Sequence, residues 1–515
     1  MLSKIKTIVL NGLIGKIIEV QTDIACGMPS FDIVGLPDAS MKEAKERIKI
    51  AIKNSGISFP SKKIVINLAP ANIKKNGTSF DLPMSIGILF SLQVIKANEL
   101  KLLSDTIFIG ELSLDGKIEK INGVLPMCIE AKRLGIKKVI LPVENCMEAS
   151  VVEDLEIIPV YSLIEIIELL NGKVEYRSTQ KNMEKNKYLV DEVNYDIDFS
   201  DVKGQKDVKR GIEIAAAGGH HCMLIGNPGT GKTMISQRIP TILPKMTFNE
   251  KLEVTKIYSI VGRLNEKCTL INVRPFRAPH YTTTTGAIIG GGKYPMPGEI
   301  SLANYGVLYL DEFPEFKREV IEALRGPLEE RTITITRVNG NVTYPANFML
   351  VISCNPCPCG YYGDPLKKCT CSEKMRRRYI SKLSGPLLDR IDIQIAVKNV
   401  SYENIKSKYK EECSCDIRKR VNIAREIQLE RYKNINIFSN AELNSSQIEE
   451  FCYINKECYN LLKEAFEKLN LSVRAYNKII KVSRTIADLE QSKDINYKHI
   501  IEAMQYRKLD RNYIN

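Results

Sequence analysis

The sequence predicts a multidomain protein in which an α+β region is followed by an α/β region and then by an all-helical region. Residues 1–171 alternate short β-rich runs with helical patterns, and residues 201–400 alternate strands, helices and glycine-rich loops. Residues 401–515 have amphipathic helical periodicity without strand signals. The polar, charged stretch 172–200 is typical of a linker. A chain of 515 residues is also too long for a single core.

The clearest helix of the first region is predicted for the string DASMKEAKERIKIAIKNSG, residues 38–56. Asp38 or Ser40 can cap its start, and Gly56 can close its end. The apolar residues that recur at helical spacing predict one buried face: Met41, Ala44, Ile48 and Ala51.

Composition narrows the class of protein. The net charge of +13 favours an anionic partner such as nucleic acid, although a lysine-rich composition alone gives the same balance. The first residues lack a signal-peptide pattern and no run of about 18 apolar residues occurs, which predicts a cytoplasmic protein without a membrane partner. In such a setting the 14 cysteines stay reduced, and a cluster among them favours metal binding over disulfides.

The string GNPGTGKT is the strongest functional signal. It follows an apolar strand, CMLI, and precedes a helical pattern. Backbone N–H groups of such a loop wrap phosphates at a helix N-terminus, while Lys232 reaches the β and γ phosphates of ATP and Thr233 binds Mg²⁺. The predicted nucleotide-binding residues are Gly226, Asn227, Pro228, Gly229, Thr230, Gly231, Lys232 and Thr233.

Two further strands deliver polar residues to the same edge of the predicted sheet. The string GVLYLDE ends in Asp311, which can hold Mg²⁺, and Glu312, which can orient or deprotonate the attacking water. The string FMLVIS delivers Asn355, whose carboxamide can position the water or contact the γ-phosphate; the alternative is an asparagine that caps a turn.

Four cysteines directly after Asn355 form the pattern C-X-C-X9-C-X-C. Four thiolates suit a tetrahedral structural zinc, whereas a catalytic zinc would need an open position for water. The alternative is a set of separate reduced cysteines. The candidate ligands are Cys357, Cys359, Cys369 and Cys371.

Two basic stretches are candidate contacts for nucleic acid. A hairpin is predicted over Thr332–Arg337, with Asn339-Gly340 as its turn, and Arg337 together with Lys293 and Tyr294 can touch a phosphate backbone or stack on a base. A basic run beyond the cysteines can bind phosphates without sequence preference: Arg376, Arg377 and Arg378. An ordinary hairpin and a solvated charged face are the alternatives.

Ten strings are specific enough to carry a family resemblance: GMPSFDIVGLPDAS, INLAPANIKKNGTSFDLP, NGVLPMCIEAKRLGI, VKGQ, GNPGTGKT, PFRAPH, LYLDEFPEF, NPCPCGYYGD, SGPLLDRID and LSVRAYNKIIKVSRTIADLE. With them the sequence resembles AAA+ ATPases of the magnesium-chelatase-like group, and more specifically the ComM/YifB family. One departure is Pro279-His280-Tyr281, where the family commonly has two histidines, so His280 receives no role.

The resemblance implies a central AAA+ P-loop domain and a C-terminal all-α lid domain in a homo-oligomeric ring of six subunits. Arg390 matches the family's arginine finger, and Arg474 matches its C-terminal sensor arginine. Guanidinium groups of this kind stabilise charge on the transferred phosphoryl group. The resemblance also implies that the insert TTTTGAIIGGGKYPMPG and the predicted hairpin face the pore of the ring.

Residues 60–145 resemble the Lon-protease-like fold that is shared with ribosomal-protein domains. Ser79 lies near where the Lon nucleophile would lie, but the base lysine of Lon has no counterpart, because the chain has Gly123-Val-Leu-Pro-Met there. We therefore interpret residues 1–171 as a non-proteolytic, ChlI-type domain.

The predicted function is an ATP-driven ring motor that translocates on or remodels DNA, the family role being helicase activity and branch migration during recombination or natural transformation. A chelatase-type or chaperone-like remodeller of a protein partner is the first alternative, and an ATP-dependent protease is the weakest. ATP and Mg²⁺ are the predicted cofactors, with a structural Zn²⁺ at the cysteines.

Overall fold

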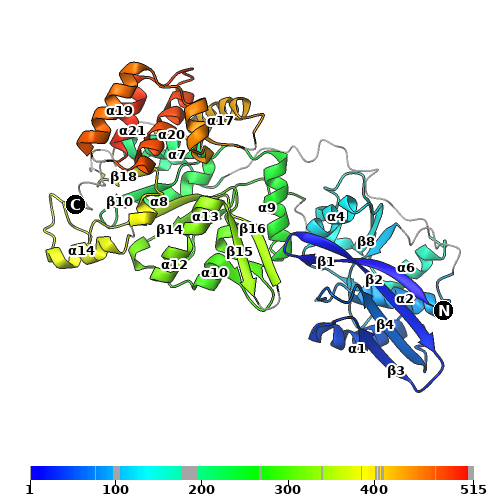
Figure 1. The fold of residues 1–515 in the computed structure, drawn as a ribbon. Coiled ribbons are helices and arrows are strands. Elements are labelled where there is room, and N and C mark those ends of the chain that lie inside the picture. The colour runs from blue at the N-terminus through cyan, green and yellow to red at the C-terminus, as the bar shows by residue number, and fades with distance from the viewer. Residues whose placement is uncertain are drawn as a thin grey trace. The chain divides into compact units, whose positions relative to one another are not determined.

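The computed structural model divides into two compact units, one formed by Met1–Asp191 with Lys251–Ile271 and the other by Glu192–Glu250 with Asn272–Asn515 (Figure 1). The predicted linker, 172–200, falls largely outside the described residues. The structure describes residues 2–75, 77–96, 105–174, 195–265, 269–337, 340–383, 385–400, 403, 406, 411–435, 437–469 and 471–507.

The first unit is built on a seven-stranded mixed sheet with the strand order β3-β4-β2-β1-β5-β8-β9. Its long central strands β1 and β2 are antiparallel, whereas β5, β8 and β9 continue the sheet in parallel. The strands of this sheet are β1 (Ser3–Asn11), β2 (Ile14–Ala25), β3 (Ser30–Val34), β4 (Lys63–Ala69), β5 (Thr106–Phe108), β8 (Lys138–Pro142) and β9 (Glu156–Val160). A short separate hairpin joins β6 (Glu111–Leu112) and β7 (Ile118–Glu119).

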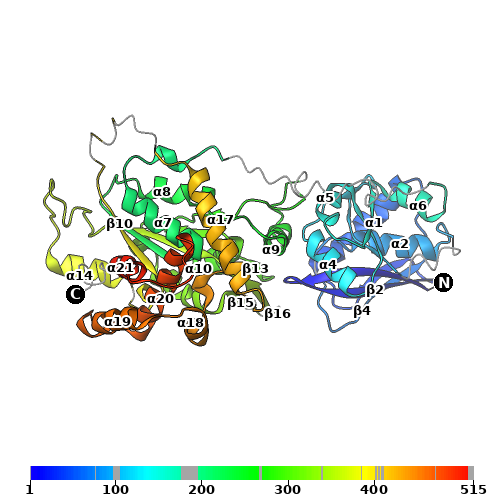
Figure 2. The ribbon, with the colours of Figure 1, turned by 90° about the horizontal axis from the view of Figure 1, so that it is seen from above.

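Helices of the first unit bury apolar faces against this sheet (Figure 2). They are α1 (Ala39–Asn54), α2 (Asp81–Ser91), α4 (Val124–Arg133), α5 (Cys146–Ala149) and α6 (Leu163–Leu170). The prediction for α1 is confirmed: Asp38 accepts a hydrogen bond from Met41 N at 3.0 Å, and Gly56 follows the end of the helix with φ +78°. The four apolar residues of its predicted face are all at most 1% exposed.

A segment that the chain reaches only after the phosphate loop also belongs to the first unit. Helix α9 (Phe248–Ile260) begins in the second unit, and from Lys251 onward it is part of the first. The carbonyl oxygen of Ser259 accepts a hydrogen bond from Gly123 N at 3.0 Å, and Leu270 is buried in the core around α4. The chain returns to the second unit at Asn272.

The second unit contains a five-stranded sheet with the order β11-β14-β17-β10-β18. All its strand pairs are parallel, so every strand has its carboxyl end at one edge and its amino end at the other. We call these the carboxyl edge and the amino edge. The strands are β10 (Cys222–Gly226), β11 (Phe276–Arg277), β14 (Val307–Leu310), β17 (Met349–Cys354) and β18 (Ile393–Val397).

Two small hairpins accompany this sheet. One pairs β12 (Gly290–Gly291) with β13 (Met296–Pro297), and the other pairs β15 (Thr332–Arg337) with β16 (Gly340–Pro345). The prediction of the second hairpin is confirmed, with Ile333 and Ile335 buried at the strand period. Its predicted turn residue Asn339 lies outside the described residues.

Helices cover the sheet of the second unit and continue into the C-terminal region. Those up to residue 400 are α7 (Lys206–Gly218), α8 (Lys232–Arg238), α10 (Thr285–Ile289), α11 (Glu299–Leu302), α12 (Arg318–Ala323), α13 (Arg325–Glu330), α14 (Glu373–Ser381) and α15 (Gly385–Leu388). Those of the C-terminal region are α17 (Ser414–Arg431), α18 (Ser445–Phe451), α19 (Lys456–Leu469), α20 (Val473–Leu489) and α21 (Tyr497–Gln505).

The C-terminal helices share one hydrophobic core with α7 and the parallel sheet, beside which they lie in Figure 1. Buried ion pairs add to this contact. Lys478 of α20 lies 2.8 Å from Asp392, whose carboxylate also accepts a hydrogen bond from His221 N. Burial raises the pKa of Asp392, but the charge of Lys478 and the contacts with His220 and His221 together outweigh burial, and the pKa lies well below its ordinary value. Helix α20 is therefore anchored at the start of β18.

Among the described residues, no helix combines the length and the apolar character that crossing a bilayer requires.

Candidate active site

The phosphate loop lies at the carboxyl edge, between the buried strand β10 and helix α8. Gly229 and Gly231 adopt φ of +80° and +87°, values that residues with a Cβ rarely adopt. Lys232 is buried, and its ammonium donates to the carbonyl oxygens of Gly226 at 2.7 Å and Asn227 at 2.9 Å. The loop is thus curled around the lysine that the sequence predicts to bind phosphate.

Asn355 lies beside that lysine. Its Oδ1 accepts a hydrogen bond from Lys232 Nζ at 3.1 Å, directly after β17 ends. Burial lowers the pKa of Lys232, so a phosphate that neutralises the ammonium would relieve the cost of holding a charge there. The structure therefore brings together the two residues that the sequence placed at this edge, although their roles in catalysis stay predictions.

Asp311 joins the same group through Thr233. The hydroxyl of Thr233 donates to Asp311 Oδ2 at 2.7 Å, and the hydroxyl of Ser353 donates to Oδ1. Burial raises the pKa of Asp311, but these hydrogen bonds together with those of Tyr309 and the Glu312 backbone outweigh burial, and the pKa lies below its ordinary value. An ionised carboxylate beside a threonine hydroxyl offers the oxygen ligands that Mg²⁺ prefers, so these side chains fit the predicted ion.

Two residues of this network were missed by the sequence analysis. Ser353 is fully buried, and its hydroxyl also accepts a hydrogen bond from Tyr309 OH at 3.2 Å. A signal was available, because strand alternation places Tyr309 on the face of Asp311 and the parallel register of β14 with β17 brings Ser353 opposite. Together these residues fix the direction of the Asp311 carboxylate.

Glu312 follows Asp311 in the left-handed region, with φ +50°. A non-glycine residue in this conformation is uncommon, and such strain is frequent at functional sites. Glu312 is exposed, so its carboxylate is open to a water molecule at the carboxyl edge. This geometry fits the predicted role of orienting or deprotonating the attacking water.

The two candidate arginines lie at the opposite edge of the sheet. Arg390 precedes β18, and its guanidinium donates to the carboxylate of Glu329 at the end of α13. Arg474, at the start of α20, lies 3.5 Å from the same carboxylate. The structure brings the arginines together with each other, but not with the phosphate loop of their own chain.

A cavity of about 370 Å³ opens at this amino edge. Its lining is rich in cationic groups, which include both candidate arginines. Charged residues of its lining include Glu329, Arg331, Arg390, Arg474, Lys478 and Lys481. Burial lowers the pKa of Lys481 to about 8, as expected for a cation that shares a pocket with others.

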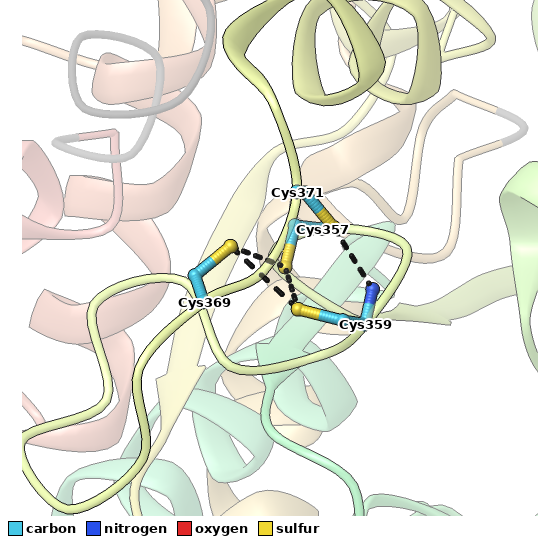
Figure 3. A group of neighbouring side chains, drawn as sticks. All are labelled: Cys357, Cys359, Cys369 and Cys371. Carbon is cyan, nitrogen blue, oxygen red and sulfur yellow. Dashed lines mark hydrogen bonds between the residues drawn. The ribbon is translucent and has the colours of Figure 1, made fainter.

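The four cysteines converge in the segment between β17 and α14 (Figure 3). The Sγ atom of Cys357 lies 3.4 Å from that of Cys359 and 3.7 Å from that of Cys369. Cys371 closes the group, since its Sγ accepts a hydrogen bond from Cys359 N at 3.3 Å. All four sulfur atoms lie within 4.8 Å of one another, a spacing that fits tetrahedral binding of one metal ion.

The predicted DNA contacts occupy two separate surfaces of the second unit. Lys293 is exposed and lies over the ring of Tyr294. A Cβ at Gly291 would lie 3.1 Å from the guanidinium of Arg337, so the hairpin of β12 and β13 meets the hairpin of β15 and β16 at this point. The basic run forms α14, which lies at the other end of the unit in Figures 1 and 2.

The three arginines of α14 differ in the contacts that their side chains make. Arg376 stacks on the ring of Tyr362 at 4.3 Å, and Arg377 pairs with Glu373 at 2.5 Å on an exposed face. Arg378 is exposed.

In the first unit, Ser79 is 8% exposed at the start of α2. The stretch Gly123-Val-Leu-Pro-Met forms the buried first turn of α4, where Val124 and Leu125 are fully buried. No described side chain in that turn can act as a base.

Comparison with known proteins covers almost the whole chain. A family model for magnesium chelatase, subunit ChlI, matches residues 198–405. Models for subunit ChlI of Mg-chelatase and for the ChlI C-terminal region match residues 20–145 and 411–507.

Curated relatives agree with these matches. The competence protein ComM of Haemophilus influenzae is 39% identical over 502 residues, which are 97% of this chain and 96% of that protein. The uncharacterized protein YifB of Escherichia coli is 39% identical over 496 residues, 96% of this chain and 94% of that protein. The archaeal Lon protease of Methanocaldococcus jannaschii is 30% identical over 137 residues, only 27% of this chain and 20% of that protein.

Proposed function

We propose, because this chain belongs to the ComM/YifB family of magnesium-chelatase-like ATPases, that it is an ATP-hydrolysing ring motor acting on DNA. The observation that carries the ATPase is the contact of Lys232 and Thr233 with Asn355 and Asp311 at the carboxyl edge. Mg²⁺ bound by Thr233 and Asp311 would neutralise charge on the phosphates, and Glu312 would orient the water. ATP and Mg²⁺ are thus the proposed cofactors.

The position of the arginines supports assembly. Arg390 and Arg474 lie at the amino edge, whereas the phosphates of the same chain would lie at the carboxyl edge. Since an arginine finger supplied by another subunit is a common way to complete such a site, we propose that each arginine pair serves a neighbouring copy. The simplest closed arrangement is a ring in which every subunit supplies its arginine pair to one neighbour and receives the pair of the other neighbour. Six subunits is the number that the family implies.

DNA as the substrate is supported by charge and by the hairpins. The chain carries a net charge of +13, and Lys293 and Arg337 meet where the two hairpins adjoin. We propose that these hairpins contact DNA in the ring and that α14 adds contacts to phosphates. The relative named as a competence protein favours a role in recombination during natural transformation, with helicase or branch-migration activity.

A cytoplasmic setting is part of this proposal. The described cysteines are unbridged, as a reducing compartment would keep them, and four are placed to bind a structural Zn²⁺. A protease is not favoured, since the stretch Gly123-Val-Leu-Pro-Met, which we compare with the segment that carries the Lon base, contains no lysine. A chelatase-type remodeller remains the second candidate, because all three family models describe the magnesium chelatase subunit.

Strand displacement and three-strand branch migration with purified full-length protein test the proposal. We expect the wild type to move strands with ATP and Glu312→Gln to be slower by about a hundredfold or more, because the general base is lost. A variant with Arg376, Arg377 and Arg378 changed to Ala should bind DNA more weakly and with a shallower salt dependence. ATP hydrolysis without DNA binding or strand movement would instead support a remodeller.

A further inference from the structure

The segment that carries the four cysteines is in direct contact with the phosphate loop. A Cβ built on Gly360 would lie 2.5 Å from Cγ and from Cδ of Pro228, so the backbone of Gly360 packs directly against the Pro228 ring. Four residues later, the carboxylate of Asp364 accepts a hydrogen bond from Asn227 Nδ2. Both partners, Asn227 and Pro228, belong to the loop that would wrap the phosphates.

Few buried side chains other than the cysteines hold this segment in place. Between the two cysteine pairs most side chains are exposed, and Leu366, an apolar residue, is 86% exposed. Without a buried core, a stretch of this length cannot offset the conformational entropy of being ordered. An ion bound by four thiolates supplies the missing free energy, as in small metal-stabilised domains.

The sulfur positions match those required around one Zn²⁺ ion. Sulfur ligands about 2.3 Å from a tetrahedral zinc lie roughly 3.8 Å from one another. The Sγ atoms of Cys357, Cys359 and Cys369 are separated by 3.4, 3.6 and 3.7 Å, far longer than a disulfide bond of about 2.05 Å. The four thiolates leave no position for water, so the ion would not take part in the hydrolysis itself.

We propose that Zn²⁺ bound by Cys357, Cys359, Cys369 and Cys371 clamps Gly360 and Asp364 against the phosphate loop and thereby sets the affinity for ATP. In this clamp the metal holds Gly360 and Asp364 in place and takes no part in the hydrolysis of ATP. Gly360 lies next to Cys359, and its N–H donates to the Cys357 carbonyl oxygen at 2.9 Å, so the packing on Pro228 is tied to two of the ligands. This inference rests on the proposed ATPase function.

The test measures zinc content and the binding of a fluorescent ATP analogue with Mg²⁺ to the full-length protein. We expect about one zinc per chain in the wild type, and ATP binding about tenfold weaker after the zinc is removed, because the loop loses its support. A protein with Cys369→Ser and Cys371→Ser should show both losses. Cobalt in place of zinc should give the absorption bands of a tetrahedral tetrathiolate site.

Two variants separate the clamp from the metal itself. Gly360→Ala introduces a Cβ against Pro228 at a residue with φ +86°, and Asp364→Ala removes the acceptor for Asn227. Both variants should keep one zinc per chain and the circular dichroism spectrum of the wild type, yet bind ATP several-fold more weakly. The matched control changes the third C-X-C pair of the chain, Cys413→Ser with Cys415→Ser, which lies outside the cluster and should alter neither the zinc content nor the ATP affinity.

The outcomes distinguish this inference from the ATPase proposal on which it rests. If zinc-loaded wild type binds no ATP, the ATPase proposal fails while the metal content still reports on the site. If ATP binds but the chain holds no zinc, or if removing zinc and changing Gly360 or Asp364 leave ATP affinity unchanged, the clamp is wrong.

Discussion

The two edges of the parallel sheet in the second unit hold different parts of the proposed ATP site. At the carboxyl edge, Lys232, Thr233, Asp311 and Asn355 are already joined by hydrogen bonds in a single chain. At the amino edge, Arg390 and Arg474 are close to each other, but the group that they contact is Glu329, a carboxylate of the same chain.

Distance explains why the two edges cannot serve one nucleotide within a chain. Strand β10 has five residues, and a parallel strand rises about 3.3 Å per residue, so the edges are separated by roughly 16 Å. Lys478 fixes α20 at the amino edge through its ion pair with Asp392, which holds Arg474 there as well. One edge is thus an ATP site that lacks its arginines, and the other is an arginine pair that lacks its phosphate.

The largest expected effect comes from removing the finger. Arg390→Ala should lower kcat for ATP hydrolysis by about a thousandfold, because the guanidinium stabilises charge on the transferred phosphoryl group. Steady-state hydrolysis measures this directly. Mixing Arg390→Ala with Lys232→Ala should restore part of the activity, since some interfaces then combine an intact loop with an intact arginine.

A failure of this recovery would contradict the placement of the two arginines in a neighbouring chain's site. An arginine that acts on its own chain's phosphates gives no recovery in the mixture, because every chain then carries a defective site. Size-exclusion chromatography of both variants is the control, since a loss of assembly would also abolish recovery.

What the sequence predicts correctly is local, and what it misses depends on contacts between distant segments. The helix α1 and the hairpin of β15 and β16 follow from periodicity and turn signals within each segment. The phosphate loop is a contiguous motif, so its position at the end of β10 was also predicted. Glu329 carried no signal, because its meeting with Arg390 joins residues that are 61 positions apart.

The same reasoning applies to the cysteine segment and to α9. The C-X-C pairs predict a cluster, but the contacts of Gly360 with Pro228 and of Asp364 with Asn227 arise only when β17 is placed beside β10. Nothing in the sequence of α9 indicates which unit this helix packs against, so the membership of Lys251–Ile271 in the first unit was not foreseen.

A smaller effect is expected at the carboxyl edge from Asn355→Ala. We expect kcat to fall by about a hundredfold, the usual cost of losing one positioned polar group, with ATP binding less affected because Lys232 keeps two carbonyl partners. Hydrolysis rates and equilibrium binding of an ATP analogue measure the two quantities separately.

Mixtures that contain Asn355→Ala also test which edge of the sheet this residue serves. A mixture of Asn355→Ala with Lys232→Ala should show no recovery of ATP hydrolysis, because both changes damage the same edge. A mixture of Asn355→Ala with Arg390→Ala should recover, because the changes damage opposite edges. Recovery in the first mixture would contradict the assignment of Asn355 to the site of Lys232.

The smallest expected effect concerns Glu329, which holds the arginine pair in the isolated chain. Glu329 is about half exposed, and an ion pair of that kind contributes up to about 1 kcal/mol. Glu329→Gln should therefore raise ATP hydrolysis at low protein concentration by no more than about fivefold, because the arginines no longer prefer their own chain's carboxylate over a neighbour's phosphate. Glu330→Gln, an exposed neighbour on the same helix, is the matched control and should leave the rate unchanged. A lower rate in Glu329→Gln would show that the carboxylate helps to position the arginines for the neighbouring site instead of competing with it.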